Sequence, residues 1–135
     1  MTKVAVLGLG AMGLPMATWL AKTFDVEAYD VSDSRRAIAE ESGLRVPPGA
    51  PAAVKDADLV LIAVRNAAQL EDLLYGEGGI VATLPKDSVI ILTSTVGIAA
   101  AERVAAKLED DGIGLVDAPV SGGPTRAGEG DLLVA

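Results

Sequence analysis

Three glycines stand close together near the start of the chain, at Gly8, Gly10 and Gly13. In this spacing the first glycine permits a tight turn, the second lets the backbone approach a pyrophosphate, and the third brings a helix close to a strand. The unpaired amides and positive dipole at the start of the next helix then hold phosphates without a basic side chain. The pattern predicts a dinucleotide site, with a plain strand-to-helix turn as the alternative.

A carboxylate follows where such a site needs one. Asp30 comes twenty residues after Gly10, at the end of the second expected strand, where it can accept hydrogen bonds from ribose hydroxyls. A carboxylate accepts the 2′-hydroxyl of NAD and repels the 2′-phosphate of NADP. Arg35 and Arg36 could instead meet that phosphate from the next helix. We therefore expect NAD as the cofactor, with NADP as the second choice.

Short apolar runs alternate with helical spacing along the chain. Expected strands are 4–7, 26–29, 59–64, 89–92, 113–116 and 132–135, and expected helices are 11–23, 33–41 after Ser32 as its cap, 52–55, 67–74, 80–84 and 98–109. Segments 45–51 and 121–130 are expected to be loops. Strands separated by helices imply parallel crossovers. We predict one α/β domain, residues 1–135, with a Rossmann-type doubly wound, mainly parallel sheet and helices on both faces.

Composition narrows the possible functions. The 135 residues include 11 basic and 19 acidic side chains, a formal charge of −8, which argues against a nucleic-acid partner. With no cysteine and no histidine, disulfides and the usual zinc sites are excluded, so no metal is expected. The N-terminus does not resemble a signal peptide and no apolar run approaches the length of a membrane span. We expect a cytoplasmic protein without a membrane partner.

Two motifs together resemble the β-hydroxyacid dehydrogenase family, within the superfamily of the 6-phosphogluconate dehydrogenase NAD-binding domain. They are residues 8–17, GLGAMGLPMA, and residues 117–123, DAPVSGG. The second motif is the more specific, because a generic Rossmann protein has no reason to carry it there. The family includes 3-hydroxyisobutyrate dehydrogenase, tartronate semialdehyde reductase and L-threonate dehydrogenase. The resemblance implies an oxidoreductase that moves a hydride between NAD and the hydroxyl-bearing carbon of a small 3-hydroxy acid.

The resemblance also assigns roles by position. It implies a pyrophosphate loop made of Gly8, Leu9, Gly10, Ala11, Met12 and Gly13, and a ribose contact at Asp30. Beside the nicotinamide ribose it implies Val64, Arg65 and Thr95. The substrate carboxylate would be held by a hydroxyl and backbone amides of Ser121, Gly122 and Gly123. An ordinary turn is the alternative for that last segment.

The chain departs from the family pattern at residues 64–66, where Val-Arg-Asn replaces a common leucine-proline pair. The segment RNAAQ at 65–69 is closer to the threonate dehydrogenase branch. We expect Arg65 to form a salt bridge with Glu71 or Asp72, the alternative being a positive charge near the substrate.

The resemblance covers the family's N-terminal cofactor domain only. The family's helical C-terminal domain, which supplies a lysine as general acid and base and a substrate-binding asparagine, has no counterpart in residues 1–135. We name no catalytic residue here, and expect the isolated chain to bind NAD without turning over hydroxy acids. A stand-alone NAD-binding or regulatory module, or a structural domain without ligand, are the alternatives. Exposed Leu132, Leu133 and Val134 are expected to leave a strand edge through which copies associate into a homo-oligomer.

Overall fold

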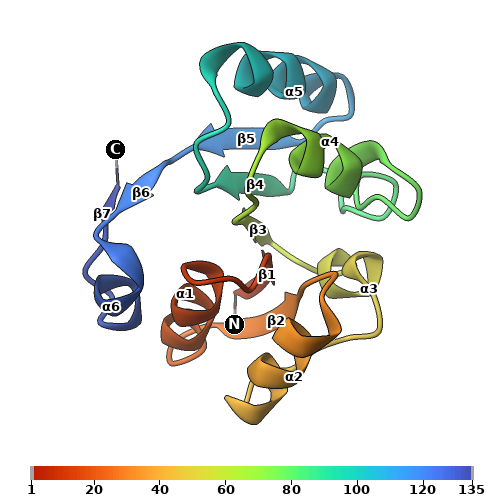
Figure 1. Cartoon of the computed structure of the whole chain (residues 1–135). Coiled ribbons are helices and arrows are strands. Elements are labelled where there is room, and N and C mark those ends of the chain that lie inside the picture. The colour runs from red at the N-terminus through yellow and green to blue at the C-terminus, as the bar shows by residue number, and fades with distance from the viewer. Residues whose placement is uncertain (1, 135) are drawn as a thin grey trace.

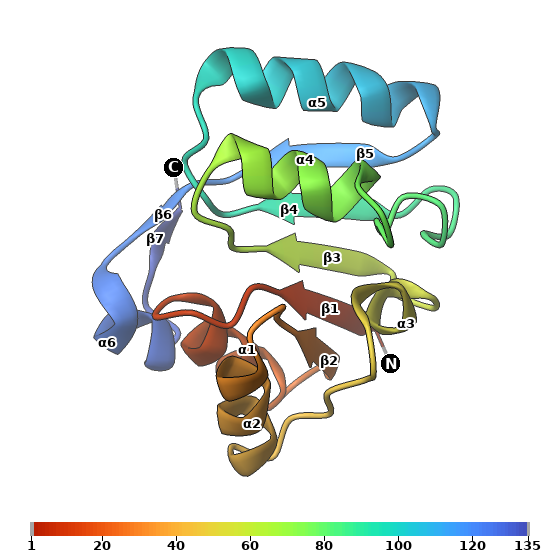
Figure 2. The same cartoon turned by 45° about the vertical axis from the view of Figure 1, so that its right-hand side comes forward.

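The centre of the fold is a parallel sheet of five strands in the order β2-β1-β3-β4-β5. The structure is a computed structural model that describes residues 2–134. The strands are β1 (Lys3–Leu7), β2 (Asp25–Tyr29), β3 (Leu59–Ile62), β4 (Val89–Leu92) and β5 (Gly114–Asp117). Their arrowheads point the same way in Figure 2, so their carboxyl ends share one edge of the sheet. The predicted α/β class and Rossmann-type parallel sheet are confirmed.

Helices cover both faces of this sheet (Figure 1). They are α1 (Gly13–Leu20), α2 (Asp33–Glu41), α3 (Ala50–Val54), α4 (Ala67–Tyr75) and α5 (Ile98–Asp110), while α6 (Gly123–Gly128) packs beside α1. On one face Leu7, Ile62 and Leu92 pack against α3, α4 and α5, and on the other Val4 and Val6 pack against α1 and α2. Apolar residues therefore run continuously through the inner strands. On the second face the cover is incomplete over β3 and β4, where Leu61 and Ile91 are only half-buried.

The local signals at α2 hold in the structure. The hydroxyl of Ser32 accepts a hydrogen bond from the N–H of Arg35, which caps the helix as predicted. Gly43, at φ +89°, lies just beyond the end of the helix, in a conformation that side chains with a Cβ rarely adopt. Beyond β2, the carbonyl of Arg45 accepts a hydrogen bond of 2.9 Å from Ala28, and a single parallel bridge there extends the sheet.

Two expected elements differ from the prediction. Residues 80–84 form only a hydrogen-bonded turn, in which the N–H of Leu84 donates to Ile80, because Pro85 follows and disfavours helix at the residue before it. The expected loop 121–130 contains α6, whose first turn includes Pro124 with its φ already suited to a helix. The α1 helix is also shorter than expected, since residues 11 and 12 form a turn before it.

The last segment does not join the main sheet. It forms β7 (Leu133–Val134), which pairs antiparallel with β6 (Val120–Ser121) in a separate two-stranded sheet. Leu133 and Val134 are exposed there, as expected, whereas Leu132 is half-buried because it lines an apolar groove. Ala135 of the predicted strand lies outside the described residues. Across residues 2–134, no helix is both long enough and apolar enough to cross a membrane.

Candidate functional site

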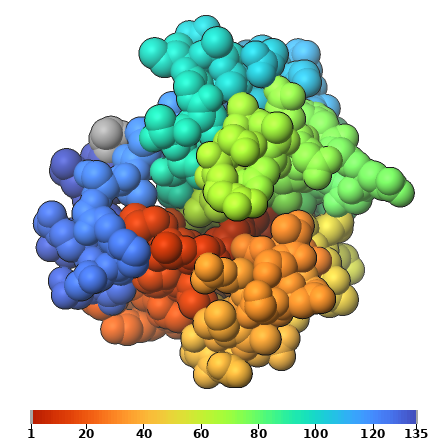
Figure 3. Space-filling view, in the orientation of Figure 1, coloured from red at the N-terminus to blue at the C-terminus, as the bar shows by residue number. Residues whose placement is uncertain are grey.

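The candidate residues gather at the carboxyl edge of the sheet. From β1 the chain passes to β2 on one side, and β3 then pairs with β1 on the other side, so the strand order reverses there. Ligands of open α/β sheets bind in the crevice that such a reversal leaves at the carboxyl ends. In Figure 3 the red N-terminal segment lies at the centre of one face, bordered by blue, green and orange segments.

The three glycines of the loop after β1 have different surroundings. Gly8 has φ +99°, and a Cβ there would overlap the carbonyl group of Ala63. A Cβ on Gly13 would overlap the carbonyl group of Gly8. At Gly10, by contrast, a Cβ would have no atom within 4 Å. The first and third glycines are therefore required for packing, and the second faces open space, as the pyrophosphate pattern demands.

The start of α1 is available to an anion. The helix begins at Gly13 after Met12, and within residues 2–134 no side chain caps it and no acid lies in its first turn. The helices α2 and α4 differ, because Ser32 and Asn66 cap them. The N–H of Leu14 donates to the carbonyl of Gly10 at 3.2 Å and Pro15 has no N–H, so in residues 2–134 the N–H of Gly13 is the one in this first turn without a protein acceptor. Phosphate oxygens can fill that role.

Asp30 joins the end of β2 to the glycine loop. Its Oδ2 accepts a hydrogen bond of 2.7 Å from the N–H of Leu9, and its Oδ1 accepts one of 2.8 Å from the N–H of Ser32. Each carboxylate oxygen can accept a further hydrogen bond, so ribose hydroxyls can still donate to it. The predicted ribose contact and the predicted pyrophosphate loop are thus in direct contact.

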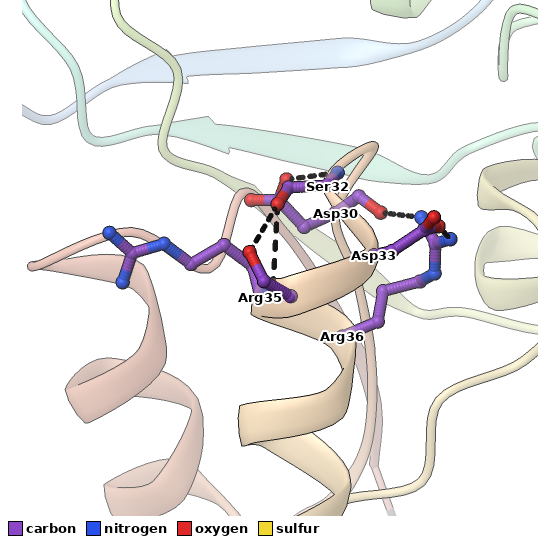
Figure 4. Close-up of polar contacts among 6 residues, drawn as sticks. Asp30, Ser32, Asp33, Arg35 and Arg36 are labelled. Carbon is purple, nitrogen blue, oxygen red and sulfur yellow. Dashed lines mark hydrogen bonds and ion pairs between the residues drawn. The ribbon is translucent and has the colours of Figure 1, made fainter.

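The two arginines after Asp30 have different environments (Figure 4). Arg36 donates to the carbonyl of Asp30 at 2.7 Å, forms an ion pair with Asp33 and lies 5.2 Å from the centre of the Tyr29 ring. The side chain of Arg35 points away from these groups, and in residues 2–134 it has no ion-pair partner. Arg36 is held in place by protein contacts, whereas Arg35 is not.

Polar side chains hold the ends of β3 and β4 together. The N–H of Val64 donates to the hydroxyl of Ser94 at 2.7 Å, and the hydroxyl of Thr93 donates to the carbonyl of Ile62 at 2.9 Å. Sequence reasoning missed Ser94 and Thr93, although both follow directly on an apolar run, which was the available signal. It singled out Thr95, which is exposed in the same loop.

The salt bridge expected for Arg65 is not formed. The carboxylate of Glu71 pairs instead with Arg103 of α5 at 3.1 Å, and Arg65 has no ion-pair partner in the described part of the chain. Arg65 lies before the first turn of α4, and Glu71 is six residues later, beyond the spacing at which helical side chains meet. The expectation was wrong because α5 brings a closer cation to Glu71.

The loop expected to bind a carboxylate follows β5 on the same edge. Ser121 ends β6, and Gly122 (φ +129°) and Gly123 (φ +75°) lead into α6. The α6 helix packs beside α1 (Figure 1). Ser121 and the Gly122–Gly123 turn are exposed or half-buried, and in residues 2–134 no side-chain hydrogen bond joins them to the glycine loop or Asp30.

Tyr75, a residue outside the candidate site, has a raised pKa. Burial, the hydrogen bond from its hydroxyl to Asp111, and the charges of Asp111 and Asp110 raise the pKa of Tyr75 to about 12. Tyr75 ends α4 and Asp111 follows α5, so this pair lies at the amino edge of the sheet, opposite the candidate site. Its role is to connect two helices.

Comparison with known proteins identifies the family. Residues 3–135 match the family described as the NAD binding domain of 6-phosphogluconate dehydrogenase. The chain is 36% identical over 132 residues to the L-threonate dehydrogenase of Cupriavidus necator, covering 96% of this chain and 44% of that protein. It is 31% identical over 133 residues to the NAD-dependent L-serine dehydrogenase of Pseudomonas aeruginosa, covering 98% and 45%.

Comparison with solved structures indicates the same family. The structure matches 3-hydroxyisobutyrate dehydrogenase of Mycobacterium tuberculosis, determined with L-serine, with a TM-score of 0.91 and 32% identity. That match covers 99% of this chain and 45% of the other, so the chain spans about half the length of the relatives it matches. The resemblance predicted from the two motifs is confirmed: the chain belongs to the family of the 6-phosphogluconate dehydrogenase NAD-binding domain, together with the β-hydroxyacid dehydrogenases.

Proposed function

We propose that this chain is the cofactor-binding part of a dehydrogenase that moves a hydride between NAD and the hydroxyl-bearing carbon of a small 3-hydroxy acid. The observation that carries the proposal is the open space at Gly10, in a loop whose other two glycines are packed against backbone. The N–H of Gly13, at the uncapped start of α1, adds a donor for the phosphates. The names of the relatives, which act on L-threonate, L-serine and 3-hydroxyisobutyrate, support a small hydroxy acid as substrate.

The surroundings of Asp30 favour NAD over NADP. Asp30 and the exposed Asp33 place negative charge where a 2′-phosphate would lie, and Arg36 is already bound to Asp33. Arg35 is the remaining cation that could accept NADP. Val31 follows Asp30 with 84% of its surface exposed, which offers an apolar contact for the adenine ring.

The remaining assignments follow the strand order. Val64, Arg65 and Thr95 come after β3 and β4, and we place the nicotinamide ribose beside them. The turn Ser121–Gly123 comes after β5 and would bind the substrate carboxylate through a hydroxyl and backbone amides. In this proposal the cofactor crosses the carboxyl edge of the sheet, from the adenine end at β2 toward the substrate at β5.

No lysine stands where it could take the proton of the substrate hydroxyl. Lys3 begins β1 and Lys86 precedes β4, at the amino edge, and Lys55 follows α3. Lys22 and Lys107 lie over the rings of Trp19 and Tyr75, 4.1 and 5.3 Å from their centres. We therefore expect residues 2–134 to hold the cofactor without supplying a lysine as the base.

We expect the purified chain to bind NAD and to leave hydroxy acids unoxidised. Calorimetric titration with NAD should show saturable binding, while NADH formation from L-threonate, 3-hydroxyisobutyrate or glycerate should stay at background. Turnover well above background would contradict the second half of this prediction, and absence of NAD binding would contradict the first. An NAD-binding module without catalysis is the second candidate, favoured by the same lack of a base. A change of oligomeric state on adding NAD would support it.

Self-association through the C-terminal segment is a further proposal. Leu133 and Val134 are 65% and 58% exposed on the short strand β7, beside an apolar groove of about 250 Å³. The groove lies between α1, the sheet and α6, and is lined by residues that include Met16, Trp19, Leu61, Ile91 and Ala127. Exposed strand edges and apolar patches favour pairing with a second copy.

We expect light scattering to show an average mass that rises with protein concentration. A Leu133→Lys variant should move the distribution toward the monomer, because a charged edge strand resists pairing. Val31→Lys, at an exposed valine outside this segment, serves as the control and should associate like the original chain. A monomer at all concentrations would show the proposal to be wrong.

A further inference from the structure

Two arginines lack an acidic partner in an acid-rich chain. Four of the six arginines form ion pairs, which are Arg36–Asp33, Arg45–Asp25, Arg103–Glu71 and Arg126–Asp131. Within residues 2–134, Arg35 and Arg65 form none. With 19 acidic against 11 basic side chains, acids are not scarce. Both arginines follow the carboxyl end of a strand, β2 and β3 respectively, at the edge where the cofactor would lie.

The segment that carries Arg65 touches the glycine loop. The N–H of Ala63 donates to the carbonyl of Leu7 at 2.9 Å, and the carbonyl of Ala63 lies directly against Gly8. The Cβ of Ala63 is 3.5 Å from the position that a Cβ on Gly13 would take. Arg65 is two residues further, a distance of at most about 7 Å along the chain. An arginine side chain is long enough to return across that distance toward Gly10.

The backbone on both sides of Arg65 is fixed. The N–H of Arg65 donates to the side-chain oxygen of Gln69 at 2.8 Å, and the N–H of Gln69 donates to the side chain of Asn66 at 2.9 Å. Asn66 therefore caps α4, and the side chain of Gln69 reaches back to Arg65, the residue before the cap, in a variation on the capping box. On the other side, Val64 is hydrogen-bonded to Ser94. The side chain of Arg65 itself is exposed, so its guanidinium is available to a ligand.

The phosphate site lacks a cation of its own. Residues 8–13 include no basic side chain, yet the pyrophosphate of a dinucleotide carries two negative charges and the chain has a net charge of −8. A guanidinium presents a planar fork of donors that matches phosphate oxygens. We propose that Arg65 binds the pyrophosphate and completes, from the end of β3, the site that the glycine loop opens. This inference rests on the proposed function and adds Arg65 as a residue that recognises the charged pyrophosphate of the cofactor.

The position of Ala63 favours the pyrophosphate over the substrate as the partner of Arg65. Ala63 contacts the glycine loop, whereas within residues 2–134 no side-chain hydrogen bond or ion pair links Arg65 to the Ser121–Gly123 turn. If the guanidinium bound the substrate carboxylate, its removal would leave the affinity for the cofactor unchanged. Measuring cofactor affinity alone therefore distinguishes a pyrophosphate contact of Arg65 from a contact with the substrate carboxylate.

The test compares two ligands that share the pyrophosphate. Dissociation constants for NAD and for ADP, which keeps the two linked phosphates but lacks the nicotinamide ring and its ribose, are measured by calorimetry at low and high salt. For Arg65→Gln we expect both constants to rise about 10-fold to 100-fold, the range of a charge-assisted hydrogen bond. The salt dependence of binding should also flatten. Arg65→Lys should recover part of the loss, because it keeps the charge without the fork. The control Arg103→Gln makes the same charge change on α5 and should leave both constants unchanged.

Other outcomes overturn the inference in distinguishable ways. If Arg65→Gln weakens the binding of NAD but not that of ADP, the guanidinium serves the nicotinamide ring or its ribose and the proposal is wrong. If both constants are unchanged while the original chain binds NAD, the inference fails and the proposed function stands. If the original chain binds neither ligand, both are overturned. Because Arg65 is exposed and its hydrogen bonds here are made by the backbone, its variants are expected to melt like the original chain.

Discussion

A Gly13→Ala variant is expected to be less stable than the original chain by about 3 kcal/mol, the cost of forcing a group into a packed site. The new Cβ would overlap the carbonyl group of Gly8, and neither of these backbone segments can rotate away. The α1 helix would have to move off the sheet, disturbing the buried contacts of Ala17. The melting temperature should fall by roughly 10 °C. Thermal and urea unfolding, followed by circular dichroism, measure both quantities.

Gly10→Ala is the matched control, expected to keep its stability and to lose affinity for NAD. No atom lies within 4 Å of the new Cβ and Gly10 is not in the left-handed region, so stability should change by no more than about 0.5 kcal/mol. The methyl group would occupy the space where the pyrophosphate must approach, and the affinity for NAD should fall about 100-fold or more. Normal NAD binding by this variant would contradict the placement of the phosphates. Normal melting of Gly13→Ala would contradict the packing of the loop.

Asp30→Ala is expected to lower both stability and cofactor affinity. The half-buried carboxylate accepts hydrogen bonds from the N–H groups of Leu9 and Ser32, and its removal should cost about 2 kcal/mol of stability. The affinity for NAD should fall about 10-fold to 100-fold, because the ribose loses its acceptor and the loop loses an anchor. NADP should be affected less, since the same change removes repulsion of the 2′-phosphate. Parallel titrations with NAD and NADP give the ratio.

Asp33→Ala provides the comparison on the same segment. The side chain of Asp33 is 94% exposed and pairs only with Arg36 among the described residues. Exposed pairs of this kind contribute little, so the melting temperature and the affinity for NAD should both stay as they were. Equal losses from Asp30→Ala and Asp33→Ala would mean that net charge, and not the position of Asp30, decides cofactor binding.

Short-range signals predicted most of the fold and the centre of the site. Apolar runs identified the five strands of the main sheet, Ser32 identified a helix start, and the spacing of Gly8 to Gly13 identified the loop. Each of these depends on neighbours within a few residues, where backbone sterics and periodicity decide the outcome. The expected acid at Asp30 also lies where predicted, because a strand of known length ends there.

Features that depend on packing between distant segments were missed. The partner of Glu71 was mistaken because Arg103 approaches from α5, thirty-two residues later. The Val64–Ser94 hydrogen bond spans thirty residues, and the apolar run before Ser94 does not indicate which strand end its hydroxyl meets. Likewise, β7 pairs with β6 and not with the main sheet, since the position of α6 against α1 directs the chain away. Sequence patterns specify elements better than they specify which distant elements meet.

The hydrogen bond between Leu9 and Asp30 has a consequence for how the two halves of a cofactor would be recognised. Because this hydrogen bond forms within the protein, the loop loses its conformational entropy during folding and not during binding. Binding therefore avoids an entropic cost of about 1–2 kcal/mol for each residue that is already ordered. A fragment that carries only the phosphate linkage would meet a loop already in its bound shape. The adenosine part of the cofactor would then make its contacts without having to order the phosphate loop. The binding free energies of the adenosine fragment and the phosphate fragment should therefore be additive.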